Sequence, residues 1–330
     1  MVNYREFPRQ PLGFFPTPIV ELKRLSNFLD GPRILMKRDD QTGLAFGGNK
    51  TRKLEFLVSD ALSKGADTLI TGGAAQSNHC RQTAAAAAIC NLECHLALSG
   101  TPPQLANGNL LLDQLLGAKI HWSGELRKGE SIPHIYEALK EVGRAPYIVP
   151  YGGSNRIGAS AFVEAIREMT TQLASETEKV THVVFASSSG GMHAGLMVGK
   201  QVFDQAFHVI GVNIDKETTD QKPFGEYILS LANDTAEHLG VAFRYSNNDL
   251  LLRSEYVGEG YGVVGELERE AIALVATYEG ILLDPIYTGR AMGGLLDMIR
   301  NKELTKRDTV LFWHTGGGPA LFAYADELIA

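Results

Sequence analysis

Lys50 is the residue of this 330-residue chain whose neighbours best suit it to covalent chemistry. It lies in the segment Gly43–Thr51, directly after Gly47, Gly48 and Asn49, where a helix is expected to begin. The segment nearly matches a nucleotide-phosphate loop, but Asn49 stands where that loop needs lysine, which excludes the nucleotide hydrolases. An amine placed here is a candidate to form a Schiff base with an aldehyde cofactor. On spacing alone, a surface lysine beside Arg52 and Lys53 is the simpler interpretation.

Four polar side chains stand together after a short apolar segment: Gln76, Ser77, Asn78 and His79. Ser and Asn commonly cap helices, and capping alone explains that pair. The backbone N–H groups at a helix start also hold carboxylates, and four polar side chains exceed what a cap requires. The segment is therefore a candidate site for a carboxylate, although capping alone is the better explanation when the segment is taken by itself.

A run of small residues follows a second apolar segment and opens another helical pattern. Ser187, Ser188, Ser189, Gly190 and Gly191 let backbone amides and hydroxyls converge on a phosphate. The run lacks the spacing of the dinucleotide fingerprint. A glycine-rich turn is the alternative, and we favour an anion site because these small residues share one junction.

Two further hydroxyl-bearing loops lie near the C-terminus. Tyr287 and Thr288 belong to the segment 284–289, and Thr315 belongs to the segment 314–318. Turn chemistry explains either loop alone. Together with the lysine and the small-residue run, the loops form a consistent set of groups for catalysis.

Short apolar segments alternate with helical patterns along the chain, which favours parallel sheets covered on both faces. In such folds, ligands bind beyond the carboxyl ends of the strands, where these loops lie. The expected strands are Ile34–Lys37, Thr68–Thr71, His95–Leu98, Lys119–Trp122, Tyr147–Val149, His182–Ala186, His208–Val212, Ile281–Leu283 and Thr309–Trp313. The expected helices are Asn49–Ser63, Arg81–Cys90, Leu110–Leu116, Ile135–Val142, Ile157–Leu173, Gly191–Phe203, Val264–Tyr278 and Ala291–Arg300.

The composition is that of an ordinary globular protein, with 44% hydrophobic and 21% charged residues. A net charge of −7 gives no electrostatic footprint for nucleic acid or an anionic membrane. No apolar run reaches the roughly 18 residues of a membrane span. Cys80, Cys90 and Cys94 are few and odd in number, which predicts a reducing, cytoplasmic location. Their spacing with His95 matches no strong zinc pattern, so we expect no metal.

The motifs together resemble the fold-type II pyridoxal 5′-phosphate enzymes, the tryptophan synthase β-like group. More narrowly, the chain is similar to the family of 1-aminocyclopropane-1-carboxylate deaminase and D-cysteine desulfhydrase. The resemblance runs nearly end to end. It is carried by Pro16–Pro18, Lys37–Asp40, Gly47–Leu57, Gln76–Ala88 and His314–Gly317.

The resemblance implies an α/β fold of two domains, each with a mostly parallel sheet flanked by helices. Residues 1–51 and 159–330 would form a large cofactor-binding domain, and residues 52–158 a small one, with the active site in the cleft between them. It also implies a homodimer and a small amino-acid substrate.

By motif, the resemblance assigns Lys50 to a Schiff base with pyridoxal phosphate and Asn78 to the phenolic oxygen of the cofactor. The implied phosphate cradle is Ser188, Ser189, Gly190, Gly191 and Met192. Ser77 would lie on the cofactor face opposite Lys50, and Gln76, Asn78 and His79 would join it around the substrate. Tyr261 and Tyr287 match the active-site tyrosines of the family. Thr288 or Thr315 would face the pyridine nitrogen.

Two positions depart from the family pattern. Met192 stands where relatives commonly have Thr, whose hydroxyl helps to hold the phosphate. Thr288 stands where the deaminases have a Glu that pairs with the ring nitrogen. A neutral hydroxyl favours an unprotonated ring, which suits expulsion of a good β-leaving group better than opening of a cyclopropane. His79 also resembles the desulfhydrases, whereas the segment 44–53 is deaminase-like.

The leading hypothesis is therefore a lyase that eliminates the β-substituent of a small amino acid, with D-cysteine giving pyruvate, ammonia and hydrogen sulfide. An L-cysteate sulfo-lyase and a 1-aminocyclopropane-1-carboxylate deaminase are the enzymatic alternatives. A non-catalytic protein that binds the cofactor or an amino acid is the alternative of another class. Retention of Lys50, Ser77, Tyr261 and Tyr287 argues against it, because simple binding needs no such lysine.

Overall fold

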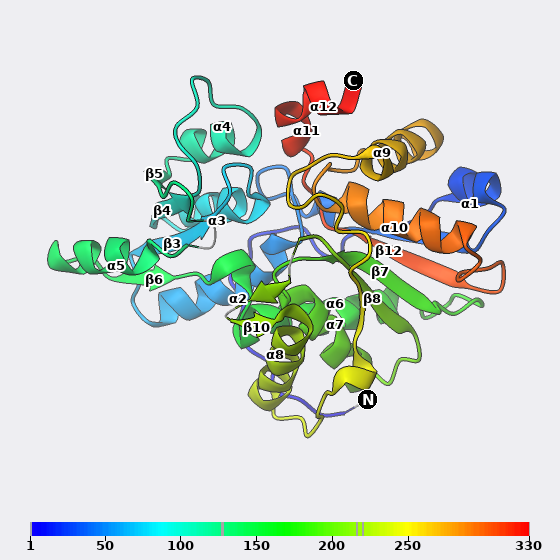
Figure 1. The fold of residues 1–330 in the computed structure, drawn as a ribbon. Coiled ribbons are helices and arrows are strands. Elements are labelled where there is room, and N and C mark those ends of the chain that lie inside the picture. Colours follow the sequence, from blue (N-terminus) through cyan, green and yellow to red (C-terminus); the bar gives the residue numbers. More distant parts are fainter. Residues whose placement is uncertain (1, 127–128, 216, 220, 330) are drawn as a thin grey trace.

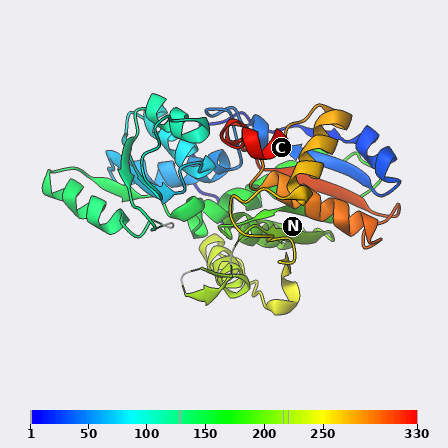
Figure 2. The same ribbon diagram turned by 45° about the horizontal axis from the view of Figure 1, so that its top comes forward.

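The computed structural model describes residues 2–126, 129–215, 217–219 and 221–329. Its strands form two main sheets, and the parts of the chain around them lie side by side in both views (Figures 1 and 2). The smaller sheet comes from one continuous stretch of the chain, whereas the larger sheet combines strands from both ends of the sequence.

The larger sheet has six strands, and all neighbours are parallel except the first pair. Side chains alternate across the central strand, so that Leu311 and Trp313 enter one core and Val310 and Phe312 the other. In sheet order the strands are β1 (Ile19–Glu21), β2 (Arg33–Arg38), β12 (Thr309–His314), β7 (His182–Ser187), β8 (His208–Asn213) and β11 (Leu251–Arg253).

Helices cover both faces of this sheet, which explains why its central strands are apolar throughout. One core contains residues of α6 (Arg156–Gln172), α7 (Gly191–Val202) and α8 (Phe224–Leu239). The other contains residues of α1 (Lys23–Leu29), α9 (Glu266–Glu279) and α10 (Thr288–Arg300).

The smaller sheet has four parallel strands in the order β5 (Lys119–Trp122), β4 (Glu93–Leu98), β3 (Thr68–Gly73) and β6 (Pro146–Ile148). The main core of this part packs α2 (Lys50–Ser63), α3 (Asn78–Ile89) and α4 (Gly108–Leu115) against it. Helix α5 (Ile132–Glu141) contributes a second, smaller cluster with Ile70 and Ala97.

Short elements complete the described chain: the 3-10 turns η1 (Asp39–Gln41), η2 (Tyr151–Gly153) and η3 (Asn247–Asp249), the strands β9 (Thr218–Thr219) and β10 (Lys222–Pro223), and the C-terminal helices α11 (Ala320–Ala323) and α12 (Ala325–Ile329). None of the helices built from described residues is long and apolar enough to cross a membrane.

The predicted strand Ile281–Leu283 is wrong, because this segment pairs with no strand. Leu283 is buried and Leu282 is exposed, so the in–out alternation of a strand is present. The central positions of the sheet are already filled by β2, β12 and β7. The carbonyl oxygen of Leu282 instead forms a hydrogen bond with Nε2 of His314 at 3.1 Å. Helices α1 and α8 are absent from the prediction, and α3 begins at Asn78 rather than at Arg81.

Candidate active site

One pocket gathers the loops that follow strands of both sheets. The segment 77–79 after β3 and the turn η2 after β6 line the pocket from the smaller sheet. The small-residue run after β7 and Thr315 after β12 line it from the larger sheet. This is the position that the carboxyl ends of parallel strands favour for a ligand. The lining is formed by Asn49, Lys50, Gly72, Ser77, Asn78, His79, Tyr151, Gly152, Ala186, Ser187, Ser188, Ser189, Gly190, Met192, His193, Tyr287 and Thr315.

Lys50 is the first residue of α2, and its amine lies 3.4 Å from the carbonyl oxygen of Gly152. Burial lowers the pKa of Lys50 to about 8. A neutral amine is the nucleophilic form, so this lysine has the reactivity that attack on an aldehyde requires. Gly152 has φ +60°, and a Cβ there would lie 2.5 Å from the Ser189 hydroxyl, so only glycine brings this backbone into the pocket.

Lys53, one turn after Lys50, is also buried and faces the small-residue run. Its amine donates to the Gly152 carbonyl at 2.9 Å and to Ser154 Oγ at 3.0 Å. Ser154 Oγ in turn donates to Ser189 Oγ at 2.8 Å and accepts from the backbone N–H of Gly191 at 3.2 Å. Burial and the charge of Lys50 hold the pKa of Lys53 well below its usual range.

The surroundings of Lys53 are those of an anion site. Across the described ranges, this lysine forms hydrogen bonds only to neutral oxygens and no ion pair with a carboxylate. A buried cation without an anion is unfavourable, and a phosphate at the N-terminus of the 12-residue helix α7 would supply the missing charge. The residues at this end of the pocket therefore fit a phosphate group.

The polar segment before α3 combines capping with a pocket-lining role. Ser77 Oγ accepts the backbone N–H of Cys80 at 3.2 Å and so caps α3. Nε2 of His79 lies 3.0 Å from the Thr71 hydroxyl, and burial with the nearby lysines holds the pKa of His79 well below its usual range. His79 is therefore neutral at physiological pH.

The two predicted tyrosines meet at the edge of the pocket. The hydroxyls of Tyr261 and Tyr287 are 2.7 Å apart, and only Tyr287 lines the pocket. Tyr261 lines an adjoining cavity, and Tyr151 lines both. Burial raises the pKa of Tyr261 and of Tyr287 well above the usual range, so both phenols stay protonated and can donate.

The structure separates the two threonines that were candidates for the pyridine nitrogen. Thr315 lines the pocket. The Thr288 hydroxyl donates to Asp284 Oδ1 and accepts from the Asp284 backbone N–H, both at 2.7 Å, and Thr288 is fully buried outside the lining.

Gln76 and Gly191 also lie outside the lining. The side-chain oxygen of Gln76 accepts from the backbone of Asn109 at 2.8 Å, so it supports a neighbouring helix. Met192 is in the lining, and its sulfur accepts from the Asn49 amide at 3.4 Å.

Several lining residues escaped the sequence analysis. Tyr151 and Gly152 lie in η2, the first element after β6, so the rule that ligands bind after strands indicates them. His193 pairs through Nδ1 with the Ser187 hydroxyl at 3.1 Å, and burial lowers its pKa to about 3. No local signal distinguishes this histidine from an ordinary core residue.

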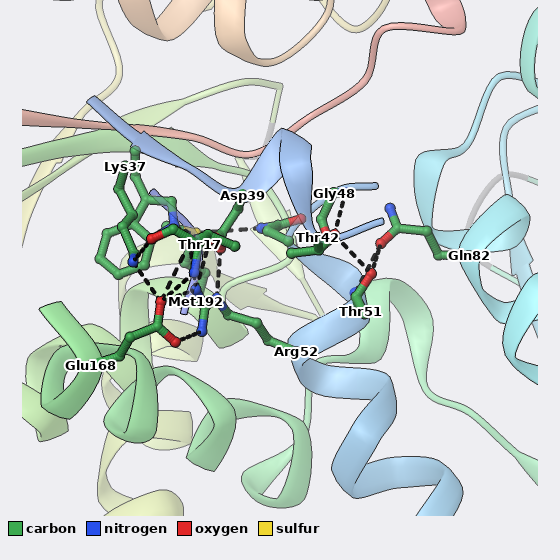
Figure 3. A network of polar contacts seen from close by, with 12 residues as sticks. Thr17, Lys37, Asp39, Thr42, Gly48, Thr51, Arg52, Gln82, Glu168 and Met192 are labelled. Carbon is green, nitrogen blue, oxygen red and sulfur yellow. Dashed lines mark hydrogen bonds and ion pairs between the residues drawn. The ribbon is translucent and has the colours of Figure 1, made fainter. Parts of the chain in front are cut away.

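A buried charge network supports the start of α2 (Figure 3). Arg52 bonds both carboxylate oxygens of Asp39 at 2.8 Å and both of Glu168 at 2.9 Å. Lys37 also donates to Glu168, and Trp313 Nε1 donates to Asp39 at 2.8 Å. The network joins α2 to β2, β12 and α6, and so fixes the helix that carries Lys50.

The chain belongs to the family of pyridoxal-phosphate dependent enzymes, whose sequence model matches residues 11–316. It is similar to a D-cysteine desulfhydrase of Klebsiella pneumoniae (strain 342), with 44% identity over 99% of each chain. A D-cysteine desulfhydrase of Salmonella choleraesuis (strain SC-B67) is also 44% identical, over 96% of each chain.

Two solved structures share the fold. An ACC deaminase homologue superimposes with a TM-score of 0.89 at 37% identity, covering 98% of this chain and 96% of the other. A hydrogen sulfide-producing enzyme from Fusobacterium nucleatum gives a TM-score of 0.66 at 16% identity, covering 94% and 97%. The fold is therefore the expected α/β fold of the type II pyridoxal phosphate enzymes.

The residues of the pocket fit this cofactor. Lys50 would supply the amine, and the small-residue run with Lys53 behind it would hold the phosphate. Thr315 supplies a hydroxyl and Asn78 an amide to the same space.

Proposed function

We propose that this enzyme eliminates the β-substituent of a small amino acid, with D-cysteine as the substrate and pyruvate, ammonia and hydrogen sulfide as the products. The observation that carries the proposal is the absence of any Asp or Glu from the described lining of the pocket. We assign Thr315, a neutral hydroxyl, to the pyridine nitrogen, because Asp284 engages Thr288. Without a neighbouring anion the ring nitrogen stays unprotonated, which suffices to expel a good leaving group.

Bound pyridoxal phosphate supplies an electron-withdrawing ring next to the substrate Cα. The chain supplies the remaining groups: Lys50 on one face and Ser77 on the other for proton removal and carboxylate binding, with the amides at the start of α3. The Cα–H and Cβ–S bonds break, and sulfur leaves with the electron pair of the Cβ–S bond. The protonated Tyr261–Tyr287 pair can donate to the departing sulfur. Water then releases ammonia and pyruvate.

The cavity beside the pocket favours cysteine over cysteate. Tyr151 lines both spaces, and Asp215, Glu217 and Glu259 line the outer one. A sulfonate approaching through this cavity meets like charge, whereas the neutral side chain of cysteine does not.

The test is pyruvate release from D-cysteine, L-cysteate and 1-aminocyclopropane-1-carboxylate, measured in parallel with a Lys50→Ala control. We expect D-cysteine to have the highest kcat/KM and Lys50→Ala to release no pyruvate. A comparable kcat/KM for the cyclopropane substrate would replace the lyase with a deaminase. Binding of the cofactor without turnover of any substrate would indicate a binding protein.

The same proposal includes the domain division, the assembly and the location expected from the sequence. Residues 1–51 and 159–330 would carry the larger sheet and residues 52–158 the smaller one, with the pocket between them. A cytoplasmic location is supported by Cys80, Cys90 and Cys94, which are free thiols. A homodimer is supported by an exposed apolar patch, which is discussed with its test below.

A further inference from the structure

A fully buried asparagine joins three segments behind the pocket. Asn109, near the start of α4, donates from Nδ2 to the Gln76 carbonyl at 2.8 Å and to Asn78 Oδ1 at 2.9 Å. Its own Oδ1 accepts from Arg81 Nη1 at 2.6 Å. The side chain thus uses both amide hydrogens and its oxygen within the protein, although it does not touch the pocket.

Arg81 also forms a hydrogen bond with Asn78, the asparagine that lines the pocket. Its Nη1 also donates to Asn78 Oδ1, at 3.3 Å, and its Nη2 donates to the Gly47 carbonyl at 2.6 Å. Burial lowers the pKa of Arg81 to about 10, which leaves the guanidinium charged at neutral pH. Arg81 therefore places a positive charge directly behind Asn78 and also ties it to the loop that precedes Lys50.

These contacts determine which end of the Asn78 amide faces the pocket. Oδ1 is engaged by two donors on the protein side. A flipped amide would set its own N–H groups against those of Arg81 and Asn109, and the two hydrogens that now bond Asn78 Oδ1 would lose their acceptor. Asn78 is 7% exposed and lines the pocket, and its Nδ2 has no partner within the described part of the chain. An amide donor is thus presented to whatever occupies this space.

We propose that Asn109 and Arg81 are positioning residues that hold the Asn78 amide with its Nδ2 toward the pocket, so that it donates to the anionic phenolic oxygen of the cofactor. The inference rests on the proposed site, which assigns Asn78 to that oxygen. A donor at this point stabilises the ionised oxygen, and the charge of Arg81 adds to the effect. The proton shared between the oxygen and the Lys50 nitrogen then stays on nitrogen.

The test uses the absorbance of the holoenzyme, because the ratio of its visible to its near-ultraviolet band reports which atom carries that proton. Asn109→Asp keeps an acceptor for Arg81 but has no hydrogen to donate to Asn78 or to the Gln76 carbonyl. We expect the band ratio to fall by roughly tenfold and the Kd for pyridoxal phosphate to rise by roughly tenfold, as loss of the hydrogen bond that orients Asn78 implies. Asn107→Asp is the matched control, because Asn107 caps the same helix and makes no contact with Asn78.

Arg81→Lys provides a second variant if Asn109→Asp does not fold. It keeps the charge and loses the fork that reaches Asn78, Asn109 and Gly47 together, so the band ratio should again fall. Asn78→Ala distinguishes failure of the proposed site from failure of the positioning role of Asn109 and Arg81. If it leaves the spectrum unchanged, the proposed site is wrong. If it shifts the spectrum while Asn109→Asp and Arg81→Lys do not, the site holds and the positioning role is refuted.

Discussion

At the scale of single residues, burial lowers the pKa of the two lysines near the pocket, because a charged amine is less stable away from water. Lys50 and Lys53 lie close enough for the charge of Lys50 to lower the pKa of Lys53, and burial lowers both. The two amines have different partners: Lys53 is bonded to Gly152 and Ser154, whereas the amine of Lys50 has one long contact. These contacts agree with the proposed roles, in which Lys53 helps to hold the phosphate and Lys50 forms the covalent bond.

The first prediction concerns the pH dependence of cofactor capture by Lys50. Its pKa of about 8 means that the neutral, nucleophilic fraction rises as the pH increases through 8 and is about a tenth at pH 7. Covalent uptake of pyridoxal phosphate by the apo-enzyme should therefore accelerate as the pH rises through 8 and level off about one unit above that pKa. Borohydride reduction followed by peptide mass spectrometry should place the label on Lys50. A label on Lys53 or on any other lysine contradicts the assignment.

The second prediction concerns Met192. Met192→Thr should lower the Kd for pyridoxal phosphate by about tenfold, because the new hydroxyl can donate to the phosphate and replaces only a 3.4 Å contact of Asn49 with sulfur. Met192→Val is the control, since it has a similar branched shape without the hydroxyl. Spectrophotometric titration of the apo-protein measures the change. Equal affinities for the two variants would show that position 192 does not face the phosphate.

The third prediction separates the two threonines. Thr315→Glu places a carboxylate beside the ring nitrogen and raises its pKa, so β-elimination should fall while the protein stays folded. Thr288→Glu instead sets a second buried carboxylate against Asp284 and should lower the free energy of unfolding by several kcal/mol. Calorimetry and pyruvate assays on both variants distinguish the positions. The reverse pattern would assign Thr288 to the cofactor.

At the scale of elements, the start of α2 is held by charges from two other elements, η1 and α6. Arg52 lies two residues after Lys50 and bonds Asp39 of η1 and Glu168 of α6. Arg52 and Glu168 are more than a hundred residues apart in the sequence. Movement of α6 relative to the larger sheet would therefore shift the helix that presents Lys50.

The fourth prediction tests this network. Burial alone would raise the pKa of Glu168, but its bonds to Arg52 and Lys37 hold it at about 2. Glu168→Gln should cost about 3–5 kcal/mol of unfolding free energy at pH 7, because it leaves buried cations without their anion. The ionised carboxylate contributes above its ordinary pKa of 4.5, so the difference between wild type and variant should shrink as the pH falls from 4.5 toward 2.

Glu270→Gln is the matched control for denaturation experiments on the network. Glu270 pairs with Arg300 on the surface, where both side chains are more than a third exposed. Its loss should cost about 1 kcal/mol or less. A similar small effect for Glu168→Gln would mean that the network does not stabilise the helix.

At the scale of the whole molecule, an exposed apolar patch spans both parts of the structure. Phe46 and Phe322 are each 71% exposed and Leu282 is 60% exposed, and all three line one cavity with Leu111 of α4. A contiguous apolar patch of this kind is typical of an interface. The patch includes Leu111 of α4, beside the smaller sheet, and Phe322 of α11, near the C-terminus. A partner bound there would therefore contact both parts of the structure and restrict their relative movement.

The fifth prediction is that light scattering gives twice the chain mass of 35.9 kDa, and that Leu282→Ser with Phe322→Ser shifts the mass toward the monomer. Burial of these side chains in a second copy drives the association. Ile89→Ser is the control, because Ile89 is comparably exposed and lies outside the cavity. A monomer in the wild type, or a dimer unaffected by the double variant, would contradict the assignment of this face.

Local patterns in the sequence were sufficient to predict most elements and most of the loops that line the pocket. Lys50, the polar segment 76–79 and the small-residue run are recognisable because helix starts and strand ends depend on neighbouring residues. The same patterns failed for Ile281–Leu283, whose alternation matches a strand although the sheet has no place for it. The family resemblance, also present in the sequence alone, is confirmed by the family match.

Only the tertiary structure decided which residues meet. Lys53 is 99 positions from Gly152, and Asn109 is 31 positions from Asn78, so no local spacing indicates either contact. Thr288 and Thr315 offer the same hydroxyl, and what separates them is the buried carboxylate of Asp284, which binds one and leaves the other to the pocket. Contacts between distant segments depend on how the two sheets pack, and that packing is a property of the whole folded chain.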